Sequence, residues 1–169
     1  VVETASWRDR ADAILLAWQP GQEAGNAIAD VLTGNVNPSG KLATTFAMQL
    51  DDYPSTVNFP GVVLEEGDPN DQSLMASARA AEIEYTDGIW VGYRHFNTRQ
   101  VATAYPFGVG LSYTVFTYRD LQLSSNTFAD KLTASVTITN SGTAAGKEIV
   151  QLYLTAPDGQ RIGFTFQSE

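Results

Sequence analysis

The sequence predicts an α/β fold: a partial α/β sandwich, with a mostly parallel sheet and a flanking helix, followed by an incomplete β-sandwich. Three observations predict it: a continuous apolar run at 11–18, a helical period at 22–33 and alternating apolar and polar residues within 116–154. A continuous run is typical of a strand covered on both faces, whereas alternation is typical of a strand with one exposed face. We expect residues 1–115 to form the first part and 116–169 the second.

The first part begins with the apolar run Ala11 to Trp18, which a Pro-Gly turn signal ends. From Gln22 to Thr33, apolar residues recur at three- and four-residue steps and form one stripe of a helix. Gly34 stands where a left-handed C-terminal cap belongs. Lys41 to Phe46 is predicted to be the next strand. The order strand, helix, strand predicts a parallel sheet with a crossover helix.

The pattern weakens from about residue 47 to 81, where turn-forming and acidic residues cluster. These clusters predict a long surface loop with a brief helical turn at 73–81. Its neighbouring acids, Asp51-Asp52 and Glu65-Glu66, are interpreted as solvated loop charge. Order resumes in the aromatic segment 83–96, which is expected to end in a polar turn at Asn97 to Arg99.

The last third predicts strands at 116–118, 121–123, 132–139 and 148–154, separated by turn signals such as Asn140-Ser141-Gly142. A complete sandwich has about seven strands, so we expect only part of one here, and 162–166 is too short to finish it. Open strand edges favour association. The chain is therefore expected to aggregate or to need a partner.

Composition excludes several classes of function. Nineteen acidic residues against ten basic ones give a net charge of −9, which argues against a nucleic-acid partner. The absence of cysteine excludes thiolate catalysis and disulfides, and a single histidine, His95, excludes a multi-histidine zinc site. No apolar run approaches the ~20 residues of a membrane helix. We expect no metal, cofactor or membrane contact. The sequence starts at Val1 without Met, which is expected of a segment of a longer protein.

Two glycines, Gly108 and Gly110, flank one valine and follow a proline. They could be taken for a dinucleotide fingerprint, but the third glycine is missing. The favoured interpretation is geometric: positions that need a positive φ or a close backbone approach where one domain passes into the next. His95 is interpreted as a hydrogen-bonded structural residue rather than a general base, because no nucleophile motif accompanies it.

Nineteen acids leave room for a glycosidase-type carboxylate pair, but a sequence does not give the separation that such a pair needs. Glu23 favours the positive end of a helix dipole and needs no catalytic role. Trp18, Trp90 and the tyrosines could form a sugar-stacking surface, although core and interface packing is favoured for each. The residues alone assign no function.

A resemblance to a known protein family indicates a function. Residues 17–25 and 29–42 resemble the signature of the C-terminal α/β-sandwich domain of glycoside hydrolase family 3, which includes many β-glucosidases and β-xylosidases. Residues 87–96 and 105–114 resemble the next two blocks of that domain. Residues 140–154 are similar to the opening half of the family's fibronectin type III-like domain. The resemblance covers about residues 5–156.

The resemblance implies the C-terminal portion of a retaining β-glycosidase that hydrolyses terminal β-linked sugars. In that family the nucleophilic aspartate lies in an N-terminal (β/α)8 barrel, and the acid/base glutamate precedes the block matched here. Neither motif occurs in this chain, so no catalytic, cofactor-binding or metal residue is assigned. The chain is expected to be inactive alone, with the barrel as its partner. The alternative is a non-catalytic carbohydrate-binding or adhesion module.

Overall fold

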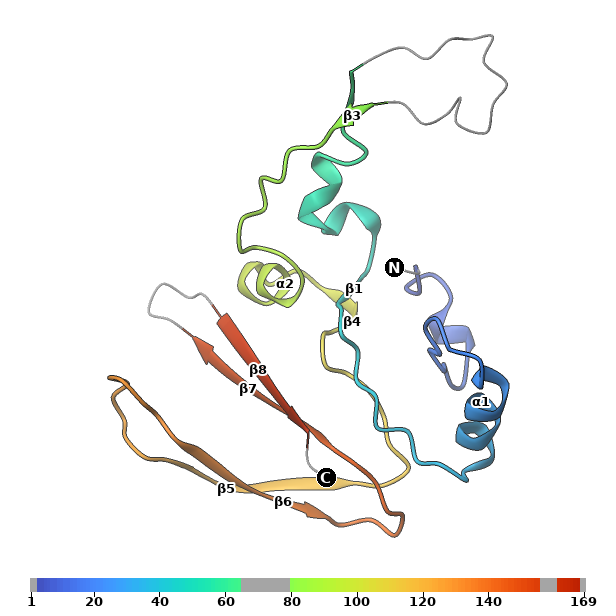
Figure 1. The fold of residues 1–169 in the computed structure, drawn as a ribbon, viewed down its shortest axis with the longest axis vertical. Coiled ribbons are helices and arrows are strands. Elements are labelled where there is room, and N and C mark those ends of the chain that lie inside the picture. The colour runs from blue at the N-terminus through green and yellow to red at the C-terminus, as the bar shows by residue number, and fades with distance from the viewer. Residues whose placement is uncertain (1–2, 65–79, 156–160, 168–169) are drawn as a thin grey trace. The chain divides into compact units, whose positions relative to one another are not determined.

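A computed structural model describes residues 3–64, 80–155 and 161–167 (Figure 1). The described chain contains two α-helices, α1 (Ala24–Thr33) and α2 (Tyr93–Arg99). Neither is long or apolar enough to cross a membrane, which is true of every helix in the described ranges. The strands are β1 (Phe46–Ala47), β2 (Val62–Val63), β3 (Ala81–Glu82), β4 (Thr103–Tyr105), β5 (Phe116–Leu123), β6 (Ala134–Asn140), β7 (Ile149–Thr155) and β8 (Arg161–Gln167).

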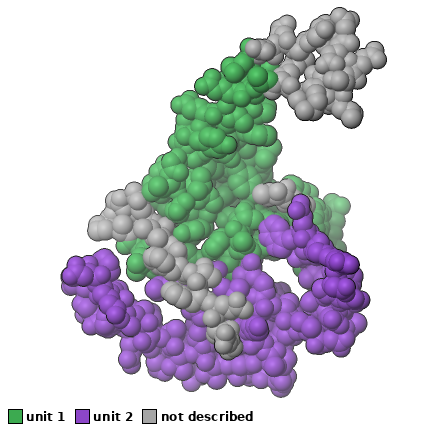
Figure 2. All heavy atoms as spheres, viewed as in Figure 1, with its two compact units in different colours: residues 1–14, 42–108, 153–162 green, residues 15–41, 109–152, 163–169 purple. Residues whose placement is uncertain are grey.

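The chain divides into two compact units, coloured separately in Figure 2. The first combines residues 1–14, 42–108 and 153–162. The second combines residues 15–41, 109–152 and 163–169. Each unit is thus assembled from segments that lie far apart in the sequence.

The core of the first unit surrounds Phe96, which is 1% exposed. Phe46, at 4% exposed, lies in β1, which pairs with β4. The ring of Tyr53 meets Phe96 edge-on at 5.5 Å, and the Tyr53 hydroxyl donates a hydrogen bond of 2.9 Å to the Thr45 carbonyl. Aromatic packing therefore joins β1, the loop after it and α2.

The apolar run at 11–18 is not the buried strand that its composition predicts. Residues 11–18 belong to no helix or strand, and Ile14, Leu15 and Trp18 are 40%, 45% and 56% exposed. A buried strand needs a hydrogen-bonded neighbour and packed elements that cover both faces of its sheet. None of the strands in the described residues pairs with this run, so its apolar side chains face solvent.

The expected parallel sheet is also wrong for every pairing whose direction is described. β1 pairs with β4, β2 with β3 and β5 with β6, and all three pairs are antiparallel. The strand predicted at Lys41 to Phe46 is confined to Phe46–Ala47. Two residues form too short a strand to build a parallel layer, which needs several neighbours linked by long crossovers.

The predicted helix is confirmed as α1. Gly34 ends it in the left-handed conformation, with φ 79°, and its N–H donates to the Val31 carbonyl at 3.1 Å. The hydroxyl of Tyr113 donates to the same Val31 carbonyl at 2.8 Å. No residue of α1 is buried, so local sequence and capping rather than core packing define this helix.

The segment after β1 is more ordered than a surface loop. It forms short 3-10 helices at Leu50–Asp52 and Pro54–Val57, and β2 and β3 then pair. Asp51 is exposed as expected, but Asp52 accepts hydrogen bonds from Gln49 and caps the first of these helices. Glu65-Glu66 lie outside the described residues, as does the predicted helical turn up to residue 79, and Ala81 begins β3.

The polar turn expected at 97–99 is the second half of α2, which continues to Arg99. Gly92, with φ 54°, precedes the helix, and Gln100 ends it in the left-handed conformation. Phe96 is buried at its centre, so tertiary packing outweighs the weak helix propensity of the polar residues that follow.

The strands predicted in the last third are confirmed in position. β5 and β6 form an antiparallel hairpin in which Phe116 faces Asn140, with an irregularity between Arg119 and Gln122. β7 pairs with β8, and β8 contains the predicted segment 162–166 (Figure 1). Their assignment to a β-sandwich stays a prediction, as does the domain boundary at 115.

Candidate functional site

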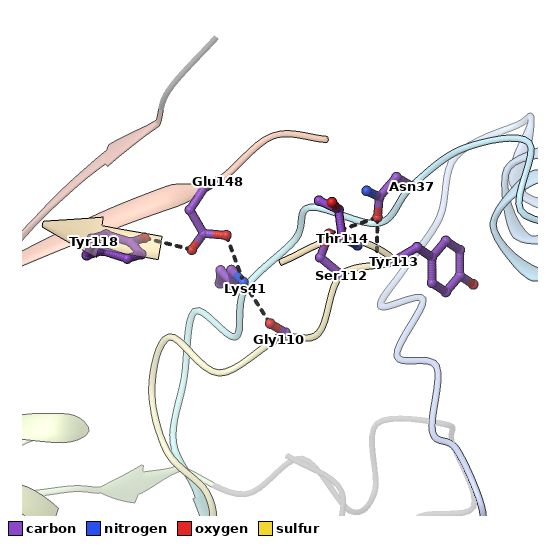
Figure 3. Close-up of polar contacts among 8 residues, drawn as sticks. All are labelled: Asn37, Lys41, Gly110, Ser112, Tyr113, Thr114, Tyr118 and Glu148. Atoms are coloured by element: carbon purple, nitrogen blue, oxygen red, sulfur yellow. Dashed lines mark hydrogen bonds and ion pairs between the residues drawn. The ribbon is translucent and has the colours of Figure 1, made fainter. Parts of the chain in front are cut away.

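A polar cluster occupies the second unit. It comprises Asn37, Lys41, Gly110, Ser112, Tyr113, Thr114, Tyr118 and Glu148 (Figure 3). At one end, the Lys41 ammonium lies 3.4 Å from the Glu148 carboxylate, and these side chains are only 12% and 11% exposed. Lys41 also donates to the Gly110 carbonyl at 2.7 Å, and Tyr118 donates to Glu148 at 3.0 Å. A buried ion pair needs such additional partners to offset desolvation.

Asn37 organises the other end of the polar cluster. Its Oδ1 accepts hydrogen bonds from the Ser112 hydroxyl at 2.9 Å and from the Tyr113 backbone N–H at 2.8 Å. Its Nδ2 donates to the Ala145 carbonyl at 2.9 Å. One amide side chain therefore joins the loop after α1 to two later segments.

Two glycines shape the backbone beside Lys41. A Cβ added to Gly110 would lie 2.4 Å from the Gly40 carbonyl oxygen, a distance that no side chain tolerates. Gly108 adopts φ 83°, in the left-handed region. The backbone part of the geometric interpretation is confirmed, since one position needs close approach and the other a positive φ; their place at a domain boundary stays a prediction. Residues 109–115 form no helix, so the context of a dinucleotide fingerprint is missing.

Tyr118 is held in its protonated form. Burial of its hydroxyl, followed by the hydrogen bond to Glu148 and the negative charge of that carboxylate, raises the pKa of Tyr118 to about 12. The phenol is thus a hydrogen-bond donor rather than a base or nucleophile at neutral pH. Each charged group of the polar cluster has a partner within it, which is typical of a structural site.

Polar groups in the first unit are arranged differently, around two open hollows. The larger, about 470 Å³, is lined by Pro54, Val57, Thr86, Asp87, Trp90, His95 and Arg99. The smaller, about 140 Å³, is lined by Ser55, Asn58, Phe59, Ile83, Glu84, Tyr85 and Asp87. Because Asp87 lines both, we treat them as one groove, named here the aromatic groove.

The aromatic groove contains three residues that the sequence singles out, His95, Trp90 and Tyr85. His95 is half-buried and meets the ring of Phe96 at 5.2 Å, while Trp90 carries the Arg99 guanidinium 5.6 Å from its ring centre. Trp18, outside the groove, is 56% exposed, so it is not a core residue of the described chain, and the interface packing also favoured for it stays a prediction. Glu23 precedes α1, as expected, and accepts a hydrogen bond from Asn26.

No group of three or more His, Asp or Glu side chains in the described residues could hold a metal ion. Sequence reasoning missed the polar cluster, because Lys41, Asn37 and Glu148 are unremarkable where they stand. The available signal was their place: each lies in a block that resembles the family.

Comparison with known proteins identifies the family. Residues 1–113 match the profile described as "Glycosyl hydrolase family 3 C-terminal domain". The chain belongs to glycoside hydrolase family 3. The matched region contains the whole aromatic groove and most members of the polar cluster.

The relatives of this family 3 chain are named as β-glucosidases. Beta-glucosidase B of Emericella nidulans is 44% identical over an alignment of 153 positions, which covers 89% of this chain and 17% of the relative. Beta-glucosidase A of Butyrivibrio fibrisolvens is 42% identical over an alignment of 178 positions, which covers 95% of this chain and 19% of the relative. The chain therefore spans about a fifth of the length of these proteins.

Solved family 3 structures have the same fold over nearly the whole chain. Beta-glucosidase 3B from Thermotoga neapolitana is 42% identical, with a TM-score of 0.82 over 99% of this chain and 22% of that protein. The GH3 beta-glucosidase of Bifidobacterium adolescentis is 32% identical, with a TM-score of 0.76 over 100% of this chain and 25% of that protein. Homologues of this chain are thus larger enzymes.

Within this family 3 chain, the resembling blocks converge on the polar cluster. The block at 29–42 supplies Asn37 and Lys41, and the block at 105–114 supplies Gly110 and its neighbours. The block at 140–154 supplies Glu148. Blocks separated along the sequence are therefore joined by one set of hydrogen bonds and one ion pair.

Proposed function

We propose that this chain is the C-terminal portion of a retaining β-glycosidase of the β-glucosidase type, acting on terminal β-linked sugars. The observation that carries the proposal is the 42 to 44% identity to proteins named as β-glucosidases. The chain matches 17 to 19% of their length, which leaves the rest of such an enzyme to supply other parts. Its partner in this proposal is the N-terminal (β/α)8 barrel of the same enzyme.

In the complete enzyme, an aspartate of the barrel forms the glycosyl-enzyme intermediate. A glutamate upstream of the segment matched here protonates the leaving oxygen and then activates water. This chain contributes neither group and is inactive alone. Its contribution is a scaffold, and the closed polar cluster supports this role because its carboxylate is committed to Lys41 and Tyr118.

The proposal also divides the chain. Residues 1–115 are the end of the α/β-sandwich domain, and residues 116–169 are the start of a fibronectin type III-like domain. The alternating sequence of β5, β6 and β7 and the antiparallel pairing of β5 with β6 support the second assignment, because such a sandwich is built from antiparallel strands.

A chimera tests the proposed function. The segment of Thermotoga neapolitana beta-glucosidase 3B that aligns with this chain is replaced by residues 1–169, and hydrolysis of an aryl β-glucoside is measured. We expect activity in the chimera, none in the enzyme lacking the segment and none in the 169-residue chain alone. Hydrolysis by the isolated chain would overturn the catalytic assignment, and a folded but inert chimera would contradict the scaffold role.

A further inference from the structure

The aromatic groove has walls that the chain itself holds in place. The Asn58 amide donates to the Glu84 carbonyl at 2.9 Å and to the Thr86 hydroxyl at 2.6 Å. These bonds tie the segment after the 3-10 helix Pro54–Val57 to the segment after β3. Gly61 strengthens the junction, since a Cβ there would lie 2.4 Å from the Glu82 carbonyl oxygen. The groove is therefore a built feature of the first unit.

Aromatic rings are distributed along the groove. Phe59 and Tyr85, which line the smaller hollow, are 69% and 86% exposed, and Trp90 lines the larger one. The hydrophobic effect disfavours such exposure, so rings kept in solvent beside a hollow indicate a ligand surface. A flat ring packs well against a flat apolar face.

Polar groups between the rings narrow the choice of ligand. Asp87 lies where the hollows meet, with Glu84 in one and Arg99 and His95 in the other. Carboxylates accept hydrogen bonds and a guanidinium donates them, so the groove can satisfy a ligand with many hydroxyl groups. The acidic pair and the chain's net charge of −9 disfavour an anion.

We propose that the aromatic groove binds a β-linked gluco-oligosaccharide. The β-linked glucopyranose ring carries equatorial hydroxyls around its edge and C–H groups on its faces, which matches a lining of aromatic rings together with carboxylate and guanidinium groups. Two adjoining hollows sharing Asp87 accommodate more than one sugar unit. The choice of β-linked glucose rests on the proposed function, whereas the groove itself rests on the contacts above.

Tryptophan fluorescence tests the proposal directly. The chain contains three tryptophans, so the variant Trp7→Phe/Trp18→Phe leaves Trp90 as the single indole. We expect cellotetraose to change the fluorescence of this variant saturably. Tyr85→Ala in the same background is expected to weaken binding by about tenfold, because one exposed ring contact is lost.

Phe128→Ala is the matched control. Phe128 is also an exposed aromatic residue, at 67%, but it does not line the groove. We expect its removal to leave the affinity for cellotetraose unchanged. Circular dichroism of each variant verifies that it is folded.

Three outcomes would overturn the inference: no saturable change with cellotetraose, equal loss in Tyr85→Ala and Phe128→Ala, or equal binding of an α-linked tetraose. The chimera separates this failure from failure of the proposed function. An active chimera with a groove that binds no sugar retains the β-glucosidase assignment and rejects the groove as a sugar site. An inactive chimera whose groove binds cellotetraose retains the groove as a sugar site and contradicts the proposed function.

Discussion

The polar cluster and the aromatic groove contain similar types of side chain, but those of the cluster bond to one another and those of the groove line open space. In the polar cluster, the Lys41 and Glu148 side chains are about a tenth exposed and bonded to one another. In the aromatic groove, Tyr85 is 86% exposed and its neighbours surround open space. The carboxylate and the cation are thus buried together in the polar cluster, whereas those of the aromatic groove line open space.

The difference teaches how to separate structural from ligand-binding polarity in a chain with many acids. Where each charged group meets a partner in a desolvated setting, removing one leaves the other stranded, and stability depends on the set. Where polar groups line a hollow, a substitution changes the affinity for a ligand and leaves the free energy of unfolding nearly unchanged. Substitutions in the two regions should therefore separate along these two measurements.

The largest loss of stability is expected for Glu148→Ala. This change strands the Lys41 ammonium in a site 12% exposed and removes the acceptor of Tyr118, which should lower the free energy of unfolding by about 3 kcal/mol. Urea denaturation followed by circular dichroism measures it. The double variant Lys41→Met/Glu148→Leu should recover most of the loss, and equal losses in both variants would contradict the ion-pair argument.

Glycine substitutions provide a second contrast, with opposite signs. Gly110→Ala brings a methyl group to 2.4 Å from the Gly40 carbonyl oxygen and should cost about 2 to 3 kcal/mol. Gly25→Ala, in α1 with nothing within 4 Å, should stabilise by about 0.5 kcal/mol, since alanine is the better helix former. Thermal melts of the two variants decide the matter, and a neutral Gly110→Ala would refute the close approach.

Asn37→Ala is expected to cost about 2 kcal/mol, because it leaves the Ser112 hydroxyl and the Tyr113 N–H without their acceptor. Asn37→Asp is the matched control. Its carboxylate keeps the two accepted bonds but loses the donor to the Ala145 carbonyl, so it should be destabilised less. The reverse order in urea denaturation would show that the donated bond matters more.

The smallest effect concerns pH. With the pKa of Tyr118 raised to about 12 from its ordinary value of 10.0, the folded state holds this proton more tightly than the unfolded state does. The resulting stabilisation is complete below pH 10 and is lost as the pH rises towards 12. Phenolate absorbance should show that Tyr118→Phe removes a tyrosine that titrates near pH 12. If the transition near pH 12 persisted in Tyr118→Phe, the bond to Glu148 would be contradicted.

Features set by neighbouring residues could be predicted from the sequence. The stripe at 22–33 with Gly34 gave a helix in the expected place, and alternation located β5, β6 and β7. These patterns depend on backbone period and capping, which are local.

Features set by distant partners could not be predicted. The apolar run at 11–18 has the composition of a buried strand, but burial depends on neighbouring strands, and Trp18 stays exposed. The polar cluster depends on Lys41 meeting Glu148, and neither residue has a local pattern that marks it. In the aromatic groove, the sequence singled out Trp90 and His95. That they line one groove with Asp87 and Tyr85 depends on the fold and could not be predicted.

The ion pair between Lys41 and Glu148 also sets an order of events during synthesis. The two residues are separated by 107 positions (148 minus 41). A ribosome adding about 5 to 20 residues per second needs roughly 5 to 20 seconds to travel from one to the other. Until then the Lys41 ammonium stays hydrated and its loop is not fixed by the ion pair. This part of a nascent chain therefore cannot complete its folding before β7 begins to emerge.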